Sequence, residues 1–281
     1  MNLRQAIATA TGQLAQAGVD SPEHDAKALA VHVLGLQRPS DLAHHDQIDQ
    51  ERYDALVASR AMRVPLQHLT GRTGFRFIEL EVGPGVFVPR PETESVVGWA
   101  VEALRPIKTP LVVDLCTGSG TCALAIANEV PSATVHAVEH DPGALDWAHR
   151  NAKNRAAAGD PQVQLHLGSV EAAVPELDGM VDLVISNPPY VAENERHLPD
   201  PEVVDHDPEI ALFAGEDGLD VIRLVEQAAR RLLKPGGWVV VEHSDRQGES
   251  APAVFRKGWV EVQDHRDLTG RDRYVTARLA P

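Results

Sequence analysis

The stretch of sequence that decides the fold reads Leu111-Val112-Val113-Asp114-Leu115-Cys116-Thr117-Gly118-Ser119-Gly120-Thr121. Its mostly apolar beginning, Leu111–Leu115, is typical of a strand that is buried on both faces of a sheet. The glycines that follow allow a sharp turn and let the backbone approach a ligand closely. A helix is expected next, over Thr121–Glu129, so the stretch predicts a strand–turn–helix unit.

Strands and helices alternate from this unit to the end of the chain. Buried strands are expected again at Val135–Val138, Val163–Leu167, Val181–Ser186 and Trp238–Glu242, and two last strands at Trp259–Gln263 and Tyr274–Leu279. A further helix is expected over Pro142–Ala157. This alternation implies right-handed crossovers, so the sequence predicts an α/β fold with a seven-stranded, mostly parallel, doubly wound sheet.

The first 75 residues have a different pattern and are expected to be helical. Apolar residues recur every three or four positions from Leu3 to Ala17, and a second helix begins at Ser21-Pro22. A third helix is expected over Gln50–Arg63. We predict a small α-helical domain over residues 1–75, a β-hairpin linker over 76–90, with Phe75–Val88 as its hairpin, and a catalytic domain over 91–281. The helical domain contains no catalytic or ligand-binding motif. The sequence therefore favours neither a purely structural helical bundle nor a partner-recognition domain over the other.

Composition narrows the class of protein. The formal net charge of −15 works against tight binding to a nucleic-acid backbone and suits a basic protein partner. The sequence has no run of about 18 apolar residues, so no membrane span is expected. The N-terminus lacks the apolar core of a signal peptide. The cysteines, Cys116 and Cys122, form no disulfide framework, and the histidines are scattered. We therefore expect a cytoplasmic enzyme without a metal site.

A cofactor site is predicted where the first two strands of the sheet end. Ligands of open α/β sheets bind beyond the carboxyl ends of the strands. The glycine-rich loop follows the first strand, and Glu139 follows the second, where its carboxylate can accept hydrogen bonds from both ribose hydroxyls. Together they favour a nucleoside-bearing cofactor over a plain turn and a surface carboxylate. The spacing Gly118-x-Gly120-x-x-Ala123 also fits the nicotinamide dinucleotide pattern, so the kind of cofactor stays open at this point.

The strongest chemical signal is Asn187-Pro188-Pro189-Tyr190, directly after the strand Val181–Ser186. The prolines remove two N–H donors and stiffen the turn. The side-chain oxygen of Asn187 and the carbonyl of Pro188 can then both accept hydrogen bonds from a planar NH2 group, and Tyr190 offers a ring for stacking. Holding such a poorly nucleophilic nitrogen against a sulfonium methyl group is a task of positioning and charge complementarity. A dehydrogenase has no use for this motif here, which favours an amino-methyltransferase.

The chain resembles the release factor glutamine methyltransferase family over nearly its whole length. Besides the Asn187–Tyr190 motif, the resemblance rests on Pro65–Gly71, Phe87–Glu94 and Asp217-Gly218-Leu219-Asp220. It implies a class I (Rossmann-like) methyltransferase that uses S-adenosyl-L-methionine and leaves S-adenosyl-L-homocysteine. The implied substrate is the glutamine of the Gly-Gly-Gln loop in class I peptide chain release factors, gripped elsewhere by the helical domain. The implied enzyme binds no nucleic acid stably and is expected to be a monomer.

The resemblance also implies a role for each motif residue. The donor would be bound by Cys116, Thr117, Gly118, Ser119, Gly120, Glu139, Val170 and Asn187. The target glutamine would be held by the catalytic residues Asn187, Pro188, Pro189 and Tyr190. The family usually has glycine where this chain has Cys116, and an acidic residue and an aromatic residue near Ser169-Val170.

Other functions fit parts of the pattern. A glutamine methyltransferase for a ribosomal protein differs only in family detail, and a nucleic-acid amino-methyltransferase would share the Asn-Pro-Pro-Tyr motif but flip its base. A non-catalytic cofactor-binding module is disfavoured by the intact Asn187 and Glu139. A nicotinamide oxidoreductase is disfavoured by the Asn187–Tyr190 motif.

Overall fold

The structure is a computed structural model that describes residues 2–198 and 200–281. Residues 1 and 199, which fall in the predicted ranges 1–75 and 91–281, lie outside the described residues. The chain forms two compact units. One comprises the chain up to Arg72 together with Asp200–His206, and the other comprises the rest.

The first unit is helical, as its apolar spacing predicts. Its helices are α1 (Leu3–Gln16), α2 (Pro22–Val33), α3 (Gln50–Ala61), α4 (Leu66–Thr70) and α8 (Pro201–Val204), with a 3-10 turn η1 (Pro39–His44). The side chains of Asn2 and Asp49 cap α1 and α3 by accepting backbone N–H groups. Helix α3 ends at Ala61, before the predicted Arg63, because Arg63 takes a left-handed conformation with φ 67°.

Packing in this unit centres on Leu14, Leu29 and Tyr53, which are fully buried. The Tyr53 hydroxyl donates to the Ala26 carbonyl at 2.9 Å, so the buried ring also satisfies its polar end. The guanidinium of Arg60 bridges Asp25 and Glu202, at 2.7 and 2.8 Å. This bridge ties α8 to α2 and α3 inside the unit.

A short hairpin precedes the large sheet. Its strands are β1 (Arg72–Phe75) and β2 (Ile78–Glu81), which form a two-stranded sheet. The hairpin begins and ends earlier than the predicted Phe75–Val88. Pro84 accounts for the earlier end, since proline has no N–H for a strand ladder. Helix α5 (Thr93–Leu104) follows.

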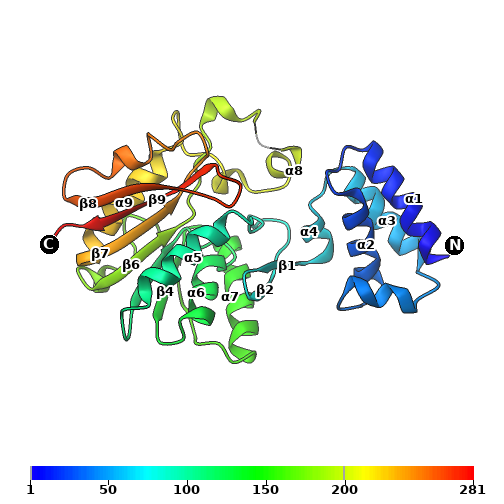
Figure 1. The fold of residues 1–281 in the computed structure, drawn as a ribbon, viewed down its shortest axis with the longest axis horizontal. Helices are drawn as coiled ribbons and strands as arrows, with labels where there is room; N and C mark the ends of the chain where they lie inside the picture. The colour runs from blue at the N-terminus through cyan, green and yellow to red at the C-terminus, as the bar shows by residue number, and fades with distance from the viewer. Residues whose placement is uncertain (1, 199) are drawn as a thin grey trace. The chain divides into compact units, whose positions relative to one another are not determined.

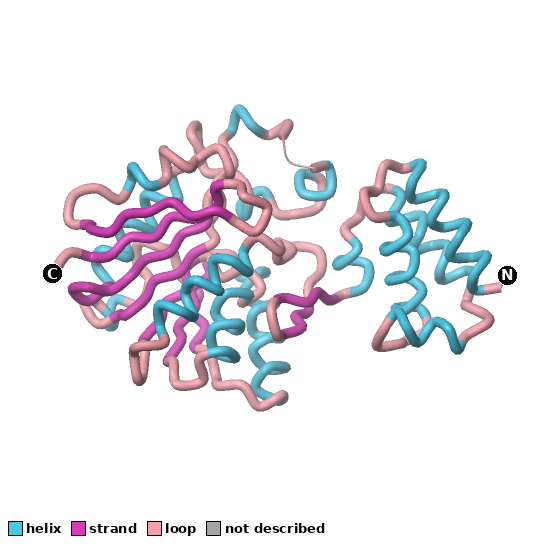
Figure 2. Tube along the Cα trace, in the orientation of Figure 1, coloured by secondary structure: helices cyan, strands magenta, loops and turns pink. Residues whose placement is uncertain are grey.

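The large sheet has seven strands in the order β5-β4-β3-β6-β7-β9-β8. Their bounds are β3 (Leu111–Leu115), β4 (Thr134–Glu139), β5 (Gln164–Leu167), β6 (Val181–Ser186), β7 (Leu233–Glu242), β8 (Trp259–Arg266) and β9 (Asp272–Leu279). Strands β3 to β7 are parallel, and β9 runs antiparallel between β7 and β8. Figure 2 shows them side by side, with the separate β1–β2 hairpin. The predicted seven-stranded, doubly wound α/β fold is confirmed.

Helices cover both faces of this sheet (Figure 1). One face packs against α5, α6 (Thr121–Glu129) and α7 (Pro142–Ala157), and the other against α9 (Asp220–Leu232). Val112 points to the first face and Val113 to the second, and both are fully buried. Neighbouring residues on both faces are buried, which is why these strands read as continuous apolar runs.

Strand register brings four strand ends into one row. Leu115 pairs with Val138 on one side and with Ser186 on the other, and Ser186 pairs with Val241. The row of residues that come next is therefore Glu139, Cys116, Asn187 and Glu242. Residues from four separate parts of the sequence thus gather at the carboxyl edge of the sheet, where ligands of such folds bind.

No helix within residues 2–198 and 200–281 has the length and apolar character needed to cross a membrane.

Candidate active site

The glycine-rich loop has an unusual backbone. Cys116, Gly118 and Gly120 all take left-handed conformations, with φ of 60°, 56° and 86°. For a residue with a Cβ this conformation costs roughly 1–2 kcal/mol, whereas glycine adopts it freely. The glycine that the resemblance implies in place of Cys116 therefore has a conformational reason. A Cβ added at Gly118 would meet no atom within 4 Å, so this side of the loop is open.

The buried Asp114 carboxylate fixes the glycine-rich loop through hydrogen bonds, a role that the sequence analysis did not predict. Its Oδ2 accepts hydrogen bonds from Thr117 Oγ1 at 2.5 Å and from the Ala123 N–H at 3.0 Å. Burial raises the pKa of this carboxyl to about 7, against the opposing effect of these two hydrogen bonds. The available signal was a lone carboxylate in an apolar strand, since such a group needs dedicated partners.

Glu139 lies against the loop, as its place at the carboxyl end of β4 predicts. One oxygen, Oε2, accepts the Gly118 N–H at 2.8 Å. The other, Oε1, accepts the N–H groups of His140 and Asp141 at 2.8 and 2.9 Å. A dinucleotide site would offer loop N–H groups to a pyrophosphate, but here the Gly118 N–H already faces a carboxylate.

The charges around the loop are acidic. The pKa of the Cys116 thiol is raised by desolvation and by the carboxylates of Glu139, Asp114 and Glu171. A field of this sign favours a cationic ligand and repels a phosphate-bearing one. It therefore favours a sulfonium cofactor over a nicotinamide dinucleotide.

Asn151 on α7 joins the loop to the hairpin, and no motif pointed to it. The residue is 1% exposed. Its Nδ2 donates to the carbonyls of Ser119 and Glu81 at 2.9 and 3.0 Å, and its Oδ1 accepts the Glu81 N–H at 2.7 Å. An amide that makes three hydrogen bonds to backbone atoms holds both segments in place.

Asn187 stands beside the loop because β6 is the neighbour of β3. The buried Ser186 hydroxyl donates to the Leu115 carbonyl at 2.7 Å and ties the two strand ends together. Asn187 Nδ2 donates to Thr93 Oγ1 at 3.1 Å. This contact uses the nitrogen of the amide and leaves Oδ1 as the atom that can accept a hydrogen bond from a ligand.

The hydroxyl end of the Tyr190 side chain is held by a hydrogen bond. Its hydroxyl donates to Glu242 Oε1 at 3.2 Å, and burial together with the Glu242 charge raises the pKa of the phenol. Its carbonyl accepts a hydrogen bond from Gln247 Nε2 at 3.2 Å. The turn Pro188-Pro189 therefore lies between two anchored residues, Asn187 and Tyr190.

The Asp217–Asp220 motif supports the same turn. A Cβ on Gly218, which has φ 71°, would lie 2.4 Å from the Tyr190 carbonyl oxygen. Only glycine allows this close approach. The Asp217 carboxylate accepts the Leu219 N–H at 3.1 Å and shapes the start of α9.

The segment before α5 is held by an ion pair. Arg90 Nη2 contacts Asp207 Oδ2 at 2.6 Å, and the Arg90 guanidinium lies 5.0 Å from the centre of the Phe87 ring. These contacts account for the arginine between two prolines, since they position the start of α5 and with it Thr93.

Val170 lies three residues after β5. It is partly buried and packs against the core cluster that contains Leu115 and Val138. Its predicted contact with adenine stays a prediction.

A seven-stranded sheet of this order, with a glycine loop after β3 and an Asn-Pro-Pro-Tyr turn after β6, defines a Rossmann-like methyltransferase. Models of two protein families match the chain: the PrmC N-terminal domain over residues 5–71 and the methyltransferase small domain over residues 84–200.

Close relatives narrow the class. The chain is 53% identical to the release factor glutamine methyltransferase of Streptomyces coelicolor, over 100% of this chain and 99% of the relative. It is 48% identical to that of Mycolicibacterium smegmatis, over 98% and 97% of the two chains, and 40% identical to that of Deinococcus radiodurans, over 100% and 99%. The chain belongs to the release factor glutamine methyltransferase family.

Among solved structures, the crystal structure of the hMettl16 catalytic domain in complex with the MAT2A 3'UTR hairpin 6 is similar, with a TM-score of 0.56. The match covers 80% of this chain and 81% of that one at 16% identity, so it supports the fold alone.

Proposed function

We propose that this protein transfers a methyl group from S-adenosyl-L-methionine to the side-chain amide N5 of the glutamine in the Gly-Gly-Gln loop of class I peptide chain release factors. One observation carries the proposal: the Asn187 amide is held by its nitrogen, next to the glycine loop, with its oxygen left to accept. The full-length relatives named release factor glutamine methyltransferase support the choice of substrate.

The donor fits the acidic loop. The open side of Gly118 leaves room for a ligand, and Glu139 can take ribose hydroxyls. Cys116, Thr117, Gly118, Ser119, Gly120, Glu139, Val170 and Asn187 are the residues that would surround it. Bound there, the donor supplies a methyl carbon activated by a sulfonium, and the acidic residues near Cys116 suit that positive charge.

The Asn187–Tyr190 turn would orient the attacking nitrogen. Asn187 Oδ1 and the Pro188 carbonyl would accept hydrogen bonds from the two N–H groups of the substrate amide and so direct its lone pair. As the nitrogen gains positive charge, both oxygens stabilise it more strongly than they stabilise the neutral amide. Release of one of its two protons to solvent would then give the neutral methylated amide. Pro189 stiffens the turn, and Tyr190 provides a ring, anchored through Glu242, on which the planar amide stacks.

The helical unit is proposed to bind the release factor away from its glutamine. The protein would act as a cytoplasmic monomer that binds no nucleic acid stably. Deleting residues up to Arg72 is then expected to spare donor affinity and methylation of a short Gly-Gly-Gln peptide. Methylation of the whole release factor should fall at least about tenfold, since recognition energy is lost. Undiminished methylation of the whole factor would show that the unit plays no part in recognition.

Replacing Glu139 by alanine is expected to weaken binding of S-adenosyl-L-methionine by about tenfold or more, because a hydrogen-bonded carboxylate is lost at the ribose and at the loop. The rate at saturating donor should change less. Titration calorimetry measures the affinity, and Glu102→Ala, an exposed carboxylate on α5, is the control. Equal donor affinity in Glu139→Ala and the unchanged protein would remove Glu139 from the donor site.

The proposed reaction is tested by incubating the protein with methyl-labelled donor and a purified class I release factor. Label is expected in the release factor and absent from a variant whose Gly-Gly-Gln glutamine is replaced. If the protein binds the donor but transfers no label to the release factor or to its variant, the proposed substrate is wrong.

A further inference from the structure

A buried carboxylate, Glu242, contacts the Asn187–Tyr190 turn through the Tyr190 hydroxyl. Glu242 ends β7 and is 1% exposed. Its Oε1 accepts the Tyr190 hydroxyl at 3.2 Å. Within residues 2–198 and 200–281, Oε2 is buried and has no hydrogen-bond partner of ordinary geometry. A buried carboxylate oxygen without a full hydrogen bond lowers the stability of the fold, so its presence here needs an explanation.

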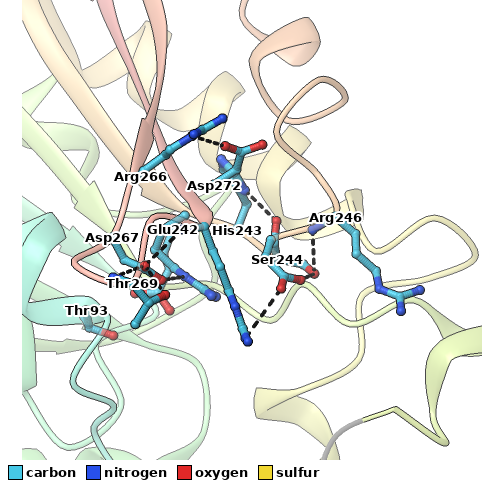
Figure 3. Close-up of polar contacts among 12 residues, drawn as sticks. Thr93, Glu242, His243, Ser244, Arg246, Arg266, Asp267, Thr269 and Asp272 are labelled. Carbon is cyan, nitrogen blue, oxygen red and sulfur yellow. Dashed lines mark hydrogen bonds and ion pairs between the residues drawn. The ribbon is translucent and has the colours of Figure 1, made fainter.

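Thr93 stands between this carboxylate and Asn187. It is 2% exposed and begins α5. Its Oγ1 accepts the Asn187 Nδ2–H at 3.1 Å, and its hydroxyl is close enough to Glu242 to lower the pKa of that carboxyl. Figure 3 shows Thr93 and Glu242 together with Asp267 of the β8–β9 turn.

The direction of this chain of contacts follows from the number of protons. A threonine hydroxyl has one proton to donate, and an ionised carboxylate can only accept. Next to ionised Glu242, the Thr93 proton is directed to the carboxylate and its lone pair to Asn187. The atom of Asn187 that faces Thr93 must then be the donor, Nδ2, and Oδ1 must face the other way.

We infer that Thr93 and Glu242 are positioning residues that orient the Asn187 amide so that its oxygen, and not its NH2 group, faces the substrate nitrogen. The inference rests on the proposed function. An inverted amide would present N–H groups to the substrate NH2, and the attacking lone pair would no longer be directed.

The surroundings of Glu242 set the pH range of this effect. Burial raises the pKa of Glu242 to about 7, against the opposing effects of Thr93, of Arg273 on β9 and of the Tyr190 hydroxyl, and Glu92 raises it further. The pKa of the buried Cys122 thiol on α6 is raised by burial and by the charges of Asp114 and Glu242. Arg273 is itself held by Asp267 at 3.1 Å. Below about pH 7 a protonated Glu242 can donate to Thr93, and the chain of contacts loses its direction.

The first test compares two replacements of Thr93. Thr93→Val removes the hydroxyl at nearly constant shape and is expected to lower kcat about 10- to 100-fold, with a smaller change in the KM for release factor. Thr93→Ser retains the hydroxyl and should recover most of the rate. Thr276→Val, a buried threonine on β9 that contacts His265, is the matched control and should keep the normal rate.

The second test follows the rate against pH. Single-turnover rates of the unchanged protein should rise roughly tenfold from pH 6 to a plateau above pH 8, as a group with a pKa near 7 ionises. Asp114 also titrates near pH 7, so the rise is assigned to Glu242 only if Glu242→Gln, with a lowered plateau, lacks it. Glu226→Gln, a buried carboxylate on α9, is the control.

The outcomes separate the two proposals. If the unchanged protein transfers no methyl to the release factor, the proposed function fails. If it transfers normally and folded Thr93→Val and Glu242→Gln match it at every pH, the inference is overturned. Should Thr93→Val not fold, as judged by circular dichroism, Glu242→Gln decides the question alone.

Discussion

Replacing Asn187 by alanine is expected to lower the methylation rate by about 100-fold or more, the loss seen when an oriented polar group is removed from a reacting centre. The side-chain oxygen acts on the nitrogen as it becomes positive, so its loss raises the barrier more than it weakens binding. Donor affinity should change little, because Glu139 and the glycine loop are untouched. Single-turnover kinetics with saturating donor and release factor measure the effect.

Asn128→Ala is the matched control, since this asparagine donates to Asp160 at 3.0 Å and lies at the end of α6. It should keep the normal rate. Full activity in Asn187→Ala, with Asn128→Ala equally active, would remove Asn187 from the mechanism.

Replacing Gly218 by alanine is expected to disturb the catalytic turn from outside it. The added Cβ would lie 2.4 Å from the Tyr190 carbonyl oxygen, and φ 71° already disfavours any side chain by roughly 1–2 kcal/mol. One of the two backbones must move, and a shift of about 1 Å at a reacting group can cost about 100-fold in rate. We expect a lower melting temperature and a rate reduced by a similar factor, with near-normal donor affinity.

Gly179→Ala separates these effects. Gly179 has φ 70°, but a Cβ there would meet no atom within 4 Å. It should lose stability to the same backbone strain and keep its methylation rate. Equal rates in Gly218→Ala and Gly179→Ala would show that contact with Tyr190 is not needed for the geometry of the turn.

The sequence predicted the sheet well because its central strands are uninterrupted apolar runs. The bounds of β3 and β6 are those expected, Leu111–Leu115 and Val181–Ser186. The predicted bounds of the hairpin before the sheet were wrong. Phe77 and Val82 continue the apolar pattern, but glycine and proline end the strand pairing at Glu81. Periodicity reports which residues are apolar and does not report which N–H groups find partners.

Part of the site was also predictable. The place of Glu139 and of the Asn187–Tyr190 turn at one edge follows from strand order alone, although their roles toward ligands stay predictions. Thr93, Asn151 and Glu242 were missed as site residues because their contacts depend on register and on helix packing. Glu242 lies close to the residues around Asn187 only because Val241 pairs with Ser186. No local sequence pattern predicts this pairing.

Tandem mass spectrometry of the release factor tests the central claim most directly. After incubation with donor, the Gly-Gly-Gln peptide is predicted to carry a single methyl group on the glutamine side-chain nitrogen. The same peptide should stay unmodified with Asn187→Ala over the same time. A methyl group on another residue, or an unmodified glutamine beside a protein that binds the donor normally, would contradict the account.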